Sequence, residues 1–233
     1  MDPISADEAT PPMNVLLLHS RYADPDGCQE LCQVDGPSAE LHVSFASDDP
    51  KVPSNPDTQR RLGLLSIGDV IRAAQADGGP DFSGPVAVDA VPDPTDLAAI
   101  GVSISQFCEQ WSGNGEQIVV CFNSLDSLLR NTESKTIFEF TYYLNQRLAS
   151  VGALGHYHLD PSRHEDRIVA AFGDIFDEVV VDDSVEMSLP EASQEEVAEL
   201  LEDLGSPDSP EFDWQTGPVE EASQNEIEEL FGE

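Results

Sequence analysis

Histidine and carboxylate side chains gather near residue 160. His156 and His158 stand two residues apart in the apolar segment ALGHYHL, and the alternation of a strand would place both side chains on one face. Asp160 and His164 follow where this strand would end, and α/β folds bind ligands at the carboxyl ends of their strands. Two imidazoles with a carboxylate suit a divalent transition metal. The spacing predicts a weak candidate metal site, or, as the simpler alternative, a buried polar histidine beside a helix that Asp160 caps.

The four cysteines comprise one close pair and two isolated residues. Cys28 and Cys32 are four residues apart on an expected helix, whereas Cys108 and Cys121 lie in apolar segments. Four cysteines in 233 residues do not indicate a disulfide framework. We expect all four to be small, reduced core residues. A metal or redox pair at Cys28 and Cys32 is the alternative, although no second CxxC-type pair accompanies it.

The segment after the first expected strand would bind phosphate if the chain used ATP. A phosphate-binding loop reads Gly-x-x-x-x-Gly-Lys followed by Ser or Thr, so that backbone N–H groups and the lysine hold the phosphates. Residues 19–28 read HSRYADPDGC, with one glycine, no lysine and two aspartates that would repel phosphate. ATP hydrolysis is therefore not expected.

The segment IVVCFNSLDSLL, residues 118–129, resembles the Walker B strand of RecA-type ATPases, especially the KaiC branch that contains the circadian-clock ATPase. In that family the apolar strand ends in Asp-Ser-Leu, where this chain has Asn123, Ser124 and Leu125. The order of elements over residues 13–185 is also similar, as in degenerate RecA-like domains of halophilic archaea. The resemblance implies a RecA-like, P-loop NTPase-type sheet. With Asn123 in place of the Mg²⁺-holding aspartate, it implies a retained scaffold rather than a working ATPase.

A sensor or an enzyme would bind its ligand at the carboxyl edge of this sheet. The residues expected to line such a pocket are Ser20, Asn123, Ser124, His156 and His158. Ser124 follows a strand, but its surroundings, FNSLD, lack the Gly-x-Ser-x-Gly turn of serine hydrolases. Nucleotide or metal binding at this edge is an alternative function, and serine hydrolysis is not expected.

Charge limits the classes of function. The chain has 46 Asp and Glu against 10 Lys and Arg, a net charge of -36, and such a chain repels phosphate backbones, which excludes nucleic acid as its main partner. Acid-rich, lysine-poor surfaces suit molar salt, where the Debye length falls to about 3 Å, so we expect a halophilic protein. The sequence shows no membrane-spanning run and no signal segment. We expect a cytoplasmic protein without a membrane partner.

Three regions differ in composition. Residues 1–12 are acidic and proline-rich and are expected to be disordered, residues 13–185 alternate apolar strands with helical patterns, and residues 186–233 contain 16 acidic residues but no Lys or Arg. We expect strands at 14–20, 40–46, 62–67, 86–91, 118–122, 153–159 and 178–181, and helices at 28–34, 94–111, 133–150 and 164–176. This alternation predicts an α/β domain with a mainly parallel sheet flanked by helices.

The acidic tail repeats one motif at an offset of 30 residues. Residues 191–201 read EASQEEVAELL and residues 221–231 read EASQNEIEELF. Each copy has a Ser-x-x-Glu capping box followed by an apolar stripe, which predicts a short helix that folds in a partner's groove. The expected partner-binding side chains are Val197, Leu200, Leu201, Ile227, Leu230 and Phe231. Two copies on one tether would raise the effective concentration at a partner.

The second copy resembles the N-terminal segment of the bacterial flagellar motor switch protein, of pattern Leu-Ser-Gln-x-Glu-Ile-Asp-x-Leu-Leu. That segment binds the phosphorylated chemotaxis response regulator. The matching residues are Ser223, Gln224, Glu226, Ile227 and Leu230. The resemblance implies a receiver domain as partner. We therefore expect a non-catalytic signalling adaptor without a cofactor; the alternatives are the ligand sensor or enzyme above, a structural subunit of a RecA-like assembly, and a tail that only solubilises.

Overall fold

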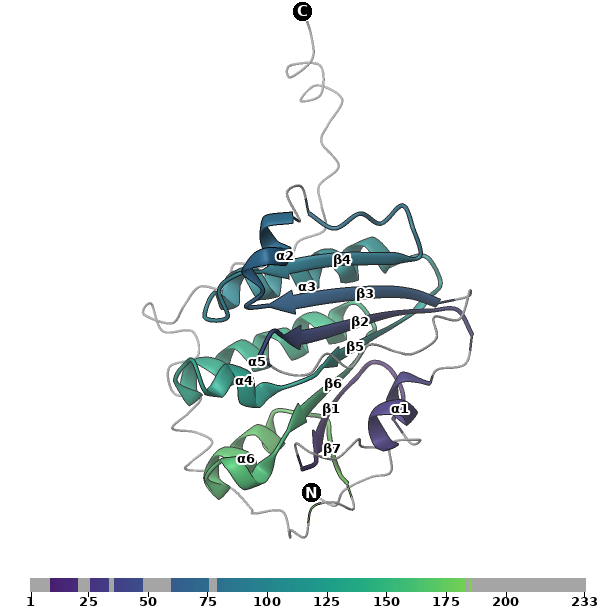
Figure 1. Ribbon diagram of the computed structural model, residues 1–233. Coiled ribbons are helices and arrows are strands. Elements are labelled where there is room, and N and C mark those ends of the chain that lie inside the picture. Colours follow the sequence, from purple (N-terminus) through teal and green to yellow (C-terminus); the bar gives the residue numbers. More distant parts are fainter. Residues whose placement is uncertain are drawn as a thin grey trace, which may run out of the picture.

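A seven-stranded sheet organises the part of the chain that the computed structural model describes, which comprises residues 9–20, 26–33, 36–47, 60–75, 79–182 and 185. The strands are β1 (Met13–Leu18), β2 (Ser38–Phe45), β3 (Arg60–Ile67), β4 (Val86–Val91), β5 (Gln117–Phe122), β6 (Leu154–Leu159) and β7 (Glu178–Val181). Their order is β4-β3-β2-β5-β6-β1-β7, and all six neighbouring pairs are parallel (Figure 1). The predicted α/β class with a parallel sheet is confirmed, and all carboxyl ends of the strands meet at one edge.

Helices cover both faces of this sheet (Figure 1). They are α1 (Asp26–Cys32), α2 (Val70–Gln75), α3 (Leu97–Trp111), α4 (Leu125–Leu129), α5 (Ser134–Ser150) and α6 (Asp166–Asp174), with a 3₁₀ turn, η2 (Pro161–Arg163). The helix expected from residue 94 begins at Leu97, because the side chain of Asp96 accepts a hydrogen bond from the backbone N–H of Ala99 and caps it. In the described ranges, no helix combines the length and apolar character needed to cross a membrane.

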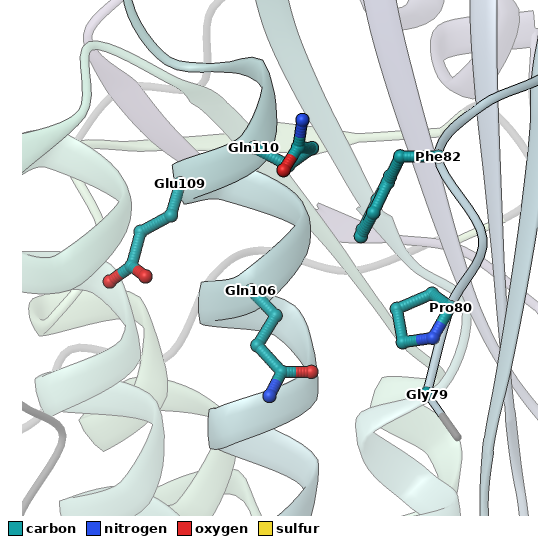
Figure 2. A pocket seen from close by; sticks show the side chains of 6 residues that line it. All are labelled: Gly79, Pro80, Phe82, Gln106, Glu109 and Gln110. Carbon is teal, nitrogen blue, oxygen red and sulfur yellow. The ribbon is translucent and has the colours of Figure 1, made fainter. Parts of the chain in front are cut away.

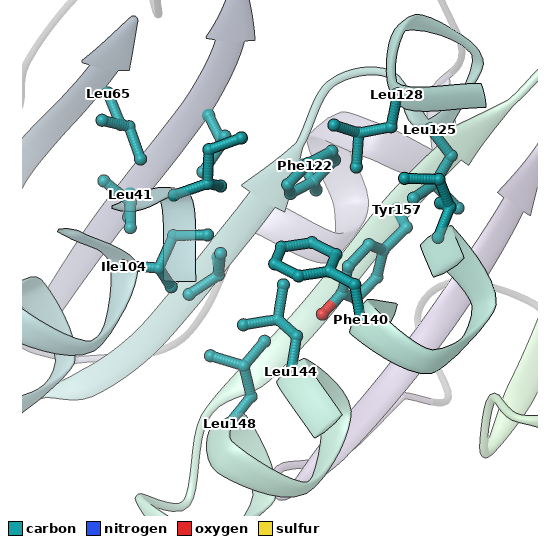
Figure 3. Close-up of a cluster of buried hydrophobic side chains, with 14 of the residues drawn as sticks. Leu41, Leu65, Ile104, Phe122, Leu125, Leu128, Phe140, Leu144, Leu148 and Tyr157 are labelled. Atoms are coloured by element: carbon teal, nitrogen blue, oxygen red, sulfur yellow. The ribbon is translucent and has the colours of Figure 1, made fainter. Parts of the chain in front are cut away.

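The larger hydrophobic core lies between the sheet and helices α3, α4, α5 and α6, and Figure 3 shows a part of it. Phe122 of β5 stacks on Tyr157 of β6 with ring centroids 5.6 Å apart, and Phe140 and Leu144 of α5 pack in the same cluster. Each such side chain, fully withdrawn from water, contributes about 1.5–3 kcal/mol. This apolar half fixes the positions of the central strands β5 and β6.

The opposite face of the sheet, here called the α1 face, is more polar. Its small apolar cluster joins Leu31 of α1 to Val15 and Leu17 of β1 and to Val119 and Leu154. Next to this cluster, alternate positions of β2, β5 and β6 carry histidine, cysteine and glutamate instead of aliphatic residues. Both copies of the tail motif, within residues 186–233, lie outside the described residues.

Candidate metal centre

Three potential metal ligands stand side by side on the α1 face. The register of the strands pairs His42 of β2 with Cys121 of β5, and Cys121 with His156 of β6. Adjacent strands lie about 4.8 Å apart, so the three side chains form a row across the middle of the sheet. Alternation adds Glu40 and His158 to the same face, and all five residues are buried.

Helix α1 brings two thiols to this row. Cys28 and Cys32 are one turn apart and therefore point to the same side of the helix. The Sγ atom of Cys28 lies 3.6 Å from Nε2 of His156, and Sγ of Cys32 lies 3.8 Å from the same nitrogen. Leu31, which precedes Cys32 on the helix, is buried in the small apolar cluster and holds the helix against the sheet. The helix thus closes the cluster from outside.

Four of these side chains bring their ligand atoms close enough together to bind one metal ion. One ligand atom from each of Cys28, Cys121, His156 and His158 lies within 4.8 Å of all the others. Zinc–sulfur and zinc–nitrogen bonds of about 2.3 and 2.0 Å place tetrahedral sulfur and nitrogen ligands about 3.5 Å apart. The Cys28–His156 contact and the Cys121–His158 contact, from Sγ to Nε2, both measure 3.6 Å. The residues present therefore fit a zinc ion.

Hydrogen bonds orient His158 as a ligand. Nδ1 of His19 lies 2.8 Å from the carbonyl oxygen of Ser20, which only accepts, so this nitrogen of His19 carries the proton. In the neutral His19 ring, Nε2 then accepts from Nδ1–H of His158, 2.8 Å away. Burial lowers the pKa of His158 to about 4, so His158 is neutral and its Nε2 lone pair faces Cys121. A partner on the far nitrogen fixes the tautomer in known metal sites in the same way.

The pKa values of the cluster's thiols shift in opposite directions. The pKa of Cys28 is lowered, first by hydrogen bonding with Cys121 and then by hydrogen bonding with Cys32. The pKa of Cys121 is raised well above its ordinary value, first by its hydrogen bonds with Cys28 and Cys32 and then by burial. The thiolate is the form that binds metals, so Cys28 offers a ready ligand.

A second group of ligands adjoins the first. The ligand atoms of Cys32, Glu40 and His42 lie within 4.8 Å of one another. Oε1 of Glu40 is 2.7 Å from Nε2 of His42, and Nη1 of Arg60 is 3.8 Å from the other carboxylate oxygen. Burial opposes ionisation of Glu40, but His42 and Arg60 outweigh it and lower its pKa.

Two imidazole nitrogens in the cluster lack partners. Nδ1 of His42 and Nδ1 of His156 are buried and have no hydrogen bond among the residues that the structure describes. Leaving a buried polar atom unpaired costs about 1–3 kcal/mol. Both atoms lie opposite the Nε2 nitrogens that contact Cys28 and Glu40, so within the described residues neither ring has the orienting hydrogen bond that His158 has.

Asp160 and His164 belong to a different place. Nε2 of His164 lies 2.6 Å from Oδ1 of Asp126, and Oδ1 of Asp160 accepts from the backbone N–H and the hydroxyl of Ser162, capping η2. The sequence predicted that His156, His158, Asp160 and His164 lie together. In the structure His156 and His158 contact cysteines. Asp160 and His164 instead form hydrogen bonds that support the loop before α6.

The carboxyl edge of the sheet is paired internally. Oδ1 of Asn123 accepts from the thiol of Cys121 at 3.1 Å. The hydroxyl of Ser124 accepts from the backbone N–H of Ser127 at 3.2 Å and caps α4. Ser20 gives its carbonyl oxygen to His19. Of the five residues expected to line a pocket at this edge, His156 and His158 therefore belong to the cluster of potential metal ligands, and Ser20, Asn123 and Ser124 do not.

The sequence interpretation missed Cys121, Glu40, His42 and His19 as members of the cluster. A signal was present, because Glu40 and His42 alternate in an otherwise apolar strand in the same way as His156 and His158. Only the strand order brings these two pairs to either side of Cys121.

A surface pocket away from this cluster is lined by other types of residue. One of about 430 Å³ lies between α3 and residues 79–82. It is lined by Pro80, Phe82, Gln106 and Gln110, while the carboxylate of Glu109 points away from Phe82 (Figure 2). Nothing in this lining resembles a metal or nucleophile site.

Comparison with known proteins shows the family of this chain. Residues 12–181 match a family described as a family of unknown function, DUF7504. No curated protein matches the chain.

Proposed function

We propose that this chain, which belongs to the DUF7504 family of unknown function, is a zinc-binding regulatory protein without catalytic activity. The observation that carries the proposal is the convergence of Cys28, Cys121, His156 and His158 within 4.8 Å. Two thiolates and two imidazoles form a ligand set that zinc prefers, and zinc binds such a set tetrahedrally. The proposal departs from the expectation of a protein without a cofactor.

Electrostatics supports zinc in this position. Two thiolates neutralise the charge of Zn²⁺, and neutral imidazoles complete the set, so the occupied site would carry no net charge. An uncharged centre avoids the large cost of burying an isolated ion. The lone pair of His158 is already directed at the cluster by His19.

The closed ligand set supports a regulatory rather than a catalytic role. Zinc with four protein ligands has no open position for substrate. Such an ion would tie α1 to β5 and β6. In the proposed relationship to RecA-type ATPases, α1 follows β1 as the helix after a phosphate-binding loop does, and here thiols would hold that helix in place of a nucleotide.

The first test is metal analysis of the full chain. We propose that the protein is halophilic, because its net charge is -36, and cytoplasmic, because its cysteines are free. It is therefore purified in molar KCl under reducing conditions. Zinc is expected to survive dialysis against excess Mg²⁺, which prefers oxygen ligands. Cys121→Ser and His156→Gln should each lose the tightly bound ion.

Matched controls come from the same residue types. Cys108 is a buried core residue, and His164 pairs with Asp126, so Cys108→Ser and His164→Gln should retain zinc. Zinc lost equally from these controls, or absent from the wild type after zinc is supplied, contradicts the proposal.

The tail repeat supports a second role as a docking element. We propose that the two copies bind one signalling protein, with a receiver domain as the first candidate. The observation is the repetition of EASQ before an apolar stripe. In the full chain, Leu201→Asp combined with Ile227→Asp should reduce binding to an activated receiver domain at least tenfold, while Glu202→Gln should not. If the wild type, the double variant and Glu202→Gln bind the receiver domain equally, the tail does not have this role.

A further inference from the structure

We propose that the α1 face holds a second zinc ion, bound by Cys32, Glu40 and His42, which exchanges with solution while the first remains bound. This inference rests on the proposed function of the first site. It adds a separate centre with a different ligand set and a different affinity.

The two centres share one helix but use different strands. Helix α1 provides Cys28 to the first centre and Cys32 to the second. Strands β5 and β6 complete the first, and β2 completes the second with Glu40 and His42. Because β2 is the direct neighbour of β5, the centres are adjacent and do not compete for a ligand.

The chemistry of the second group favours a metal over a simple ion pair. A pair between Glu40 and His42 would need only those two side chains, whereas a thiol also converges on them. Zinc would replace the proton that Oε1 of Glu40 and Nε2 of His42 share across 2.7 Å. The bonds formed would be zinc–sulfur, zinc–oxygen and zinc–nitrogen, and the protons of the thiol and of the imidazole–carboxylate pair would pass to solvent.

Charge also balances in the second centre. One thiolate and one carboxylate neutralise Zn²⁺, as two thiolates do in the first centre. Arg60 lies 3.8 Å from Oε2 of Glu40 and donates to the carbonyl oxygen of Cys32 at 3.3 Å. It therefore holds the rim of the site and leaves Oε1 directed inwards.

The number of ligands explains why this ion would exchange. Three protein ligands leave one position of tetrahedral zinc to water, as in sites where zinc meets small molecules. Glu40 and His42 keep 6% and 7% of their surface exposed, against 0% for Cys121 and His156, and the side chain of Arg60 beside them is partly exposed, so this centre lies nearer the solvent. Its occupancy would follow the free zinc concentration and report it through α1.

The test counts zinc ions in the full chain by native mass spectrometry and by competition with a chromophoric chelator. Wild type, loaded with zinc in molar KCl with excess Mg²⁺, is expected to hold two ions and to yield one readily to the chelator. Glu40→Gln, His42→Gln and Cys32→Ser should each hold one ion, which the chelator removes slowly. Glu116→Gln is the matched control, because Glu116 pairs with Arg61 outside both centres, and it should hold two.

The outcomes separate the two proposals. If the wild type binds one zinc ion and Glu40→Gln also binds one, the second centre is rejected and the first is still supported. Two ions in both Glu40→Gln and Cys32→Ser would place the second ion elsewhere and also overturn it. No ion in wild type would reject both centres. Circular dichroism identifies a misfolded variant, and because Glu40 and Cys32 lie on different elements, either variant suffices.

Discussion

Nε2 of His19 lies 2.8 Å from Nδ1 of His158, so the carboxyl end of β1 is in direct contact with the candidate metal centre. His19 is not among the four proposed ligands, yet it holds the proton of His158 on the nitrogen that faces away from the cluster. Residues that orient a ligand in this way are retained in metal sites because the ligand's basicity depends on them.

We therefore expect His19→Ala to weaken zinc binding about 10–100-fold without abolishing it, the usual effect of removing a partner that orients a ligand. Chelator competition measures the affinity. A glutamine at the same position can still accept the proton of His158, so His19→Gln should restore part of the loss. Equal affinity in wild type and His19→Ala would show that His19 does not orient the ligand.

Alkylation should separate the cysteines. Burial raises the pKa of Cys108 to about 12, and the thiolate is the reactive form; at pH 8.5 roughly one part in a thousand or less is ionised. Cys108 should stay unmodified by iodoacetamide until the pH approaches 12. Cys28, whose pKa is lowered, should react in the zinc-free protein and be protected by zinc. Peptide mass spectrometry measures both, and modification of Cys108 as fast as Cys28 would contradict the expectation.

Gly63 is required by close packing against α3. A Cβ atom there would lie 2.6 Å from Trp111 and 2.8 Å from Phe107. Gly63→Ala should lower the free energy of unfolding by about 1–3 kcal/mol, the cost of overpacking a core. Gly84→Ala is the control, because its Cβ would meet nothing nearer than 3.9 Å. Denaturant titration compares them; equal stabilities would mean that the two aromatic rings can move.

Tyr157 buries a hydroxyl that has no hydrogen-bond partner among the residues the structure describes. Tyr157→Phe removes this group and keeps the stacking on Phe122, so the free energy of unfolding should rise by about 1 kcal/mol. Urea denaturation measures the change. A loss of stability would instead show that the hydroxyl is hydrogen-bonded in solution.

Local patterns were sufficient for much of the fold. The run IVVCF predicted a strand at the centre of a parallel sheet, and β5 occupies the middle of the seven strands. The short helices α2 and α4 were not expected, because five or six residues contain too few turns to show a helical period.

The site was only partly predictable. Alternation within one strand paired His156 with His158, and helical spacing paired Cys28 with Cys32. Joining these pairs through Cys121 depends on strand order, which no local pattern encodes. Proximity in sequence was misleading for His164, whose partner Asp126 lies in helix α4, after β5.

The strand order also determines when the cluster can assemble during synthesis. Within the described residues, the first strand, β1, pairs with β6 and β7 alone, the last two strands of the sheet. While the ribosome is still making the middle of the domain, β1 has no neighbour to join and α1 has no complete surface to cover. Cys28 therefore has neither of its histidine partners until β6 has been made, whereas Glu40 and His42, the partners of Cys32, follow α1 directly on β2.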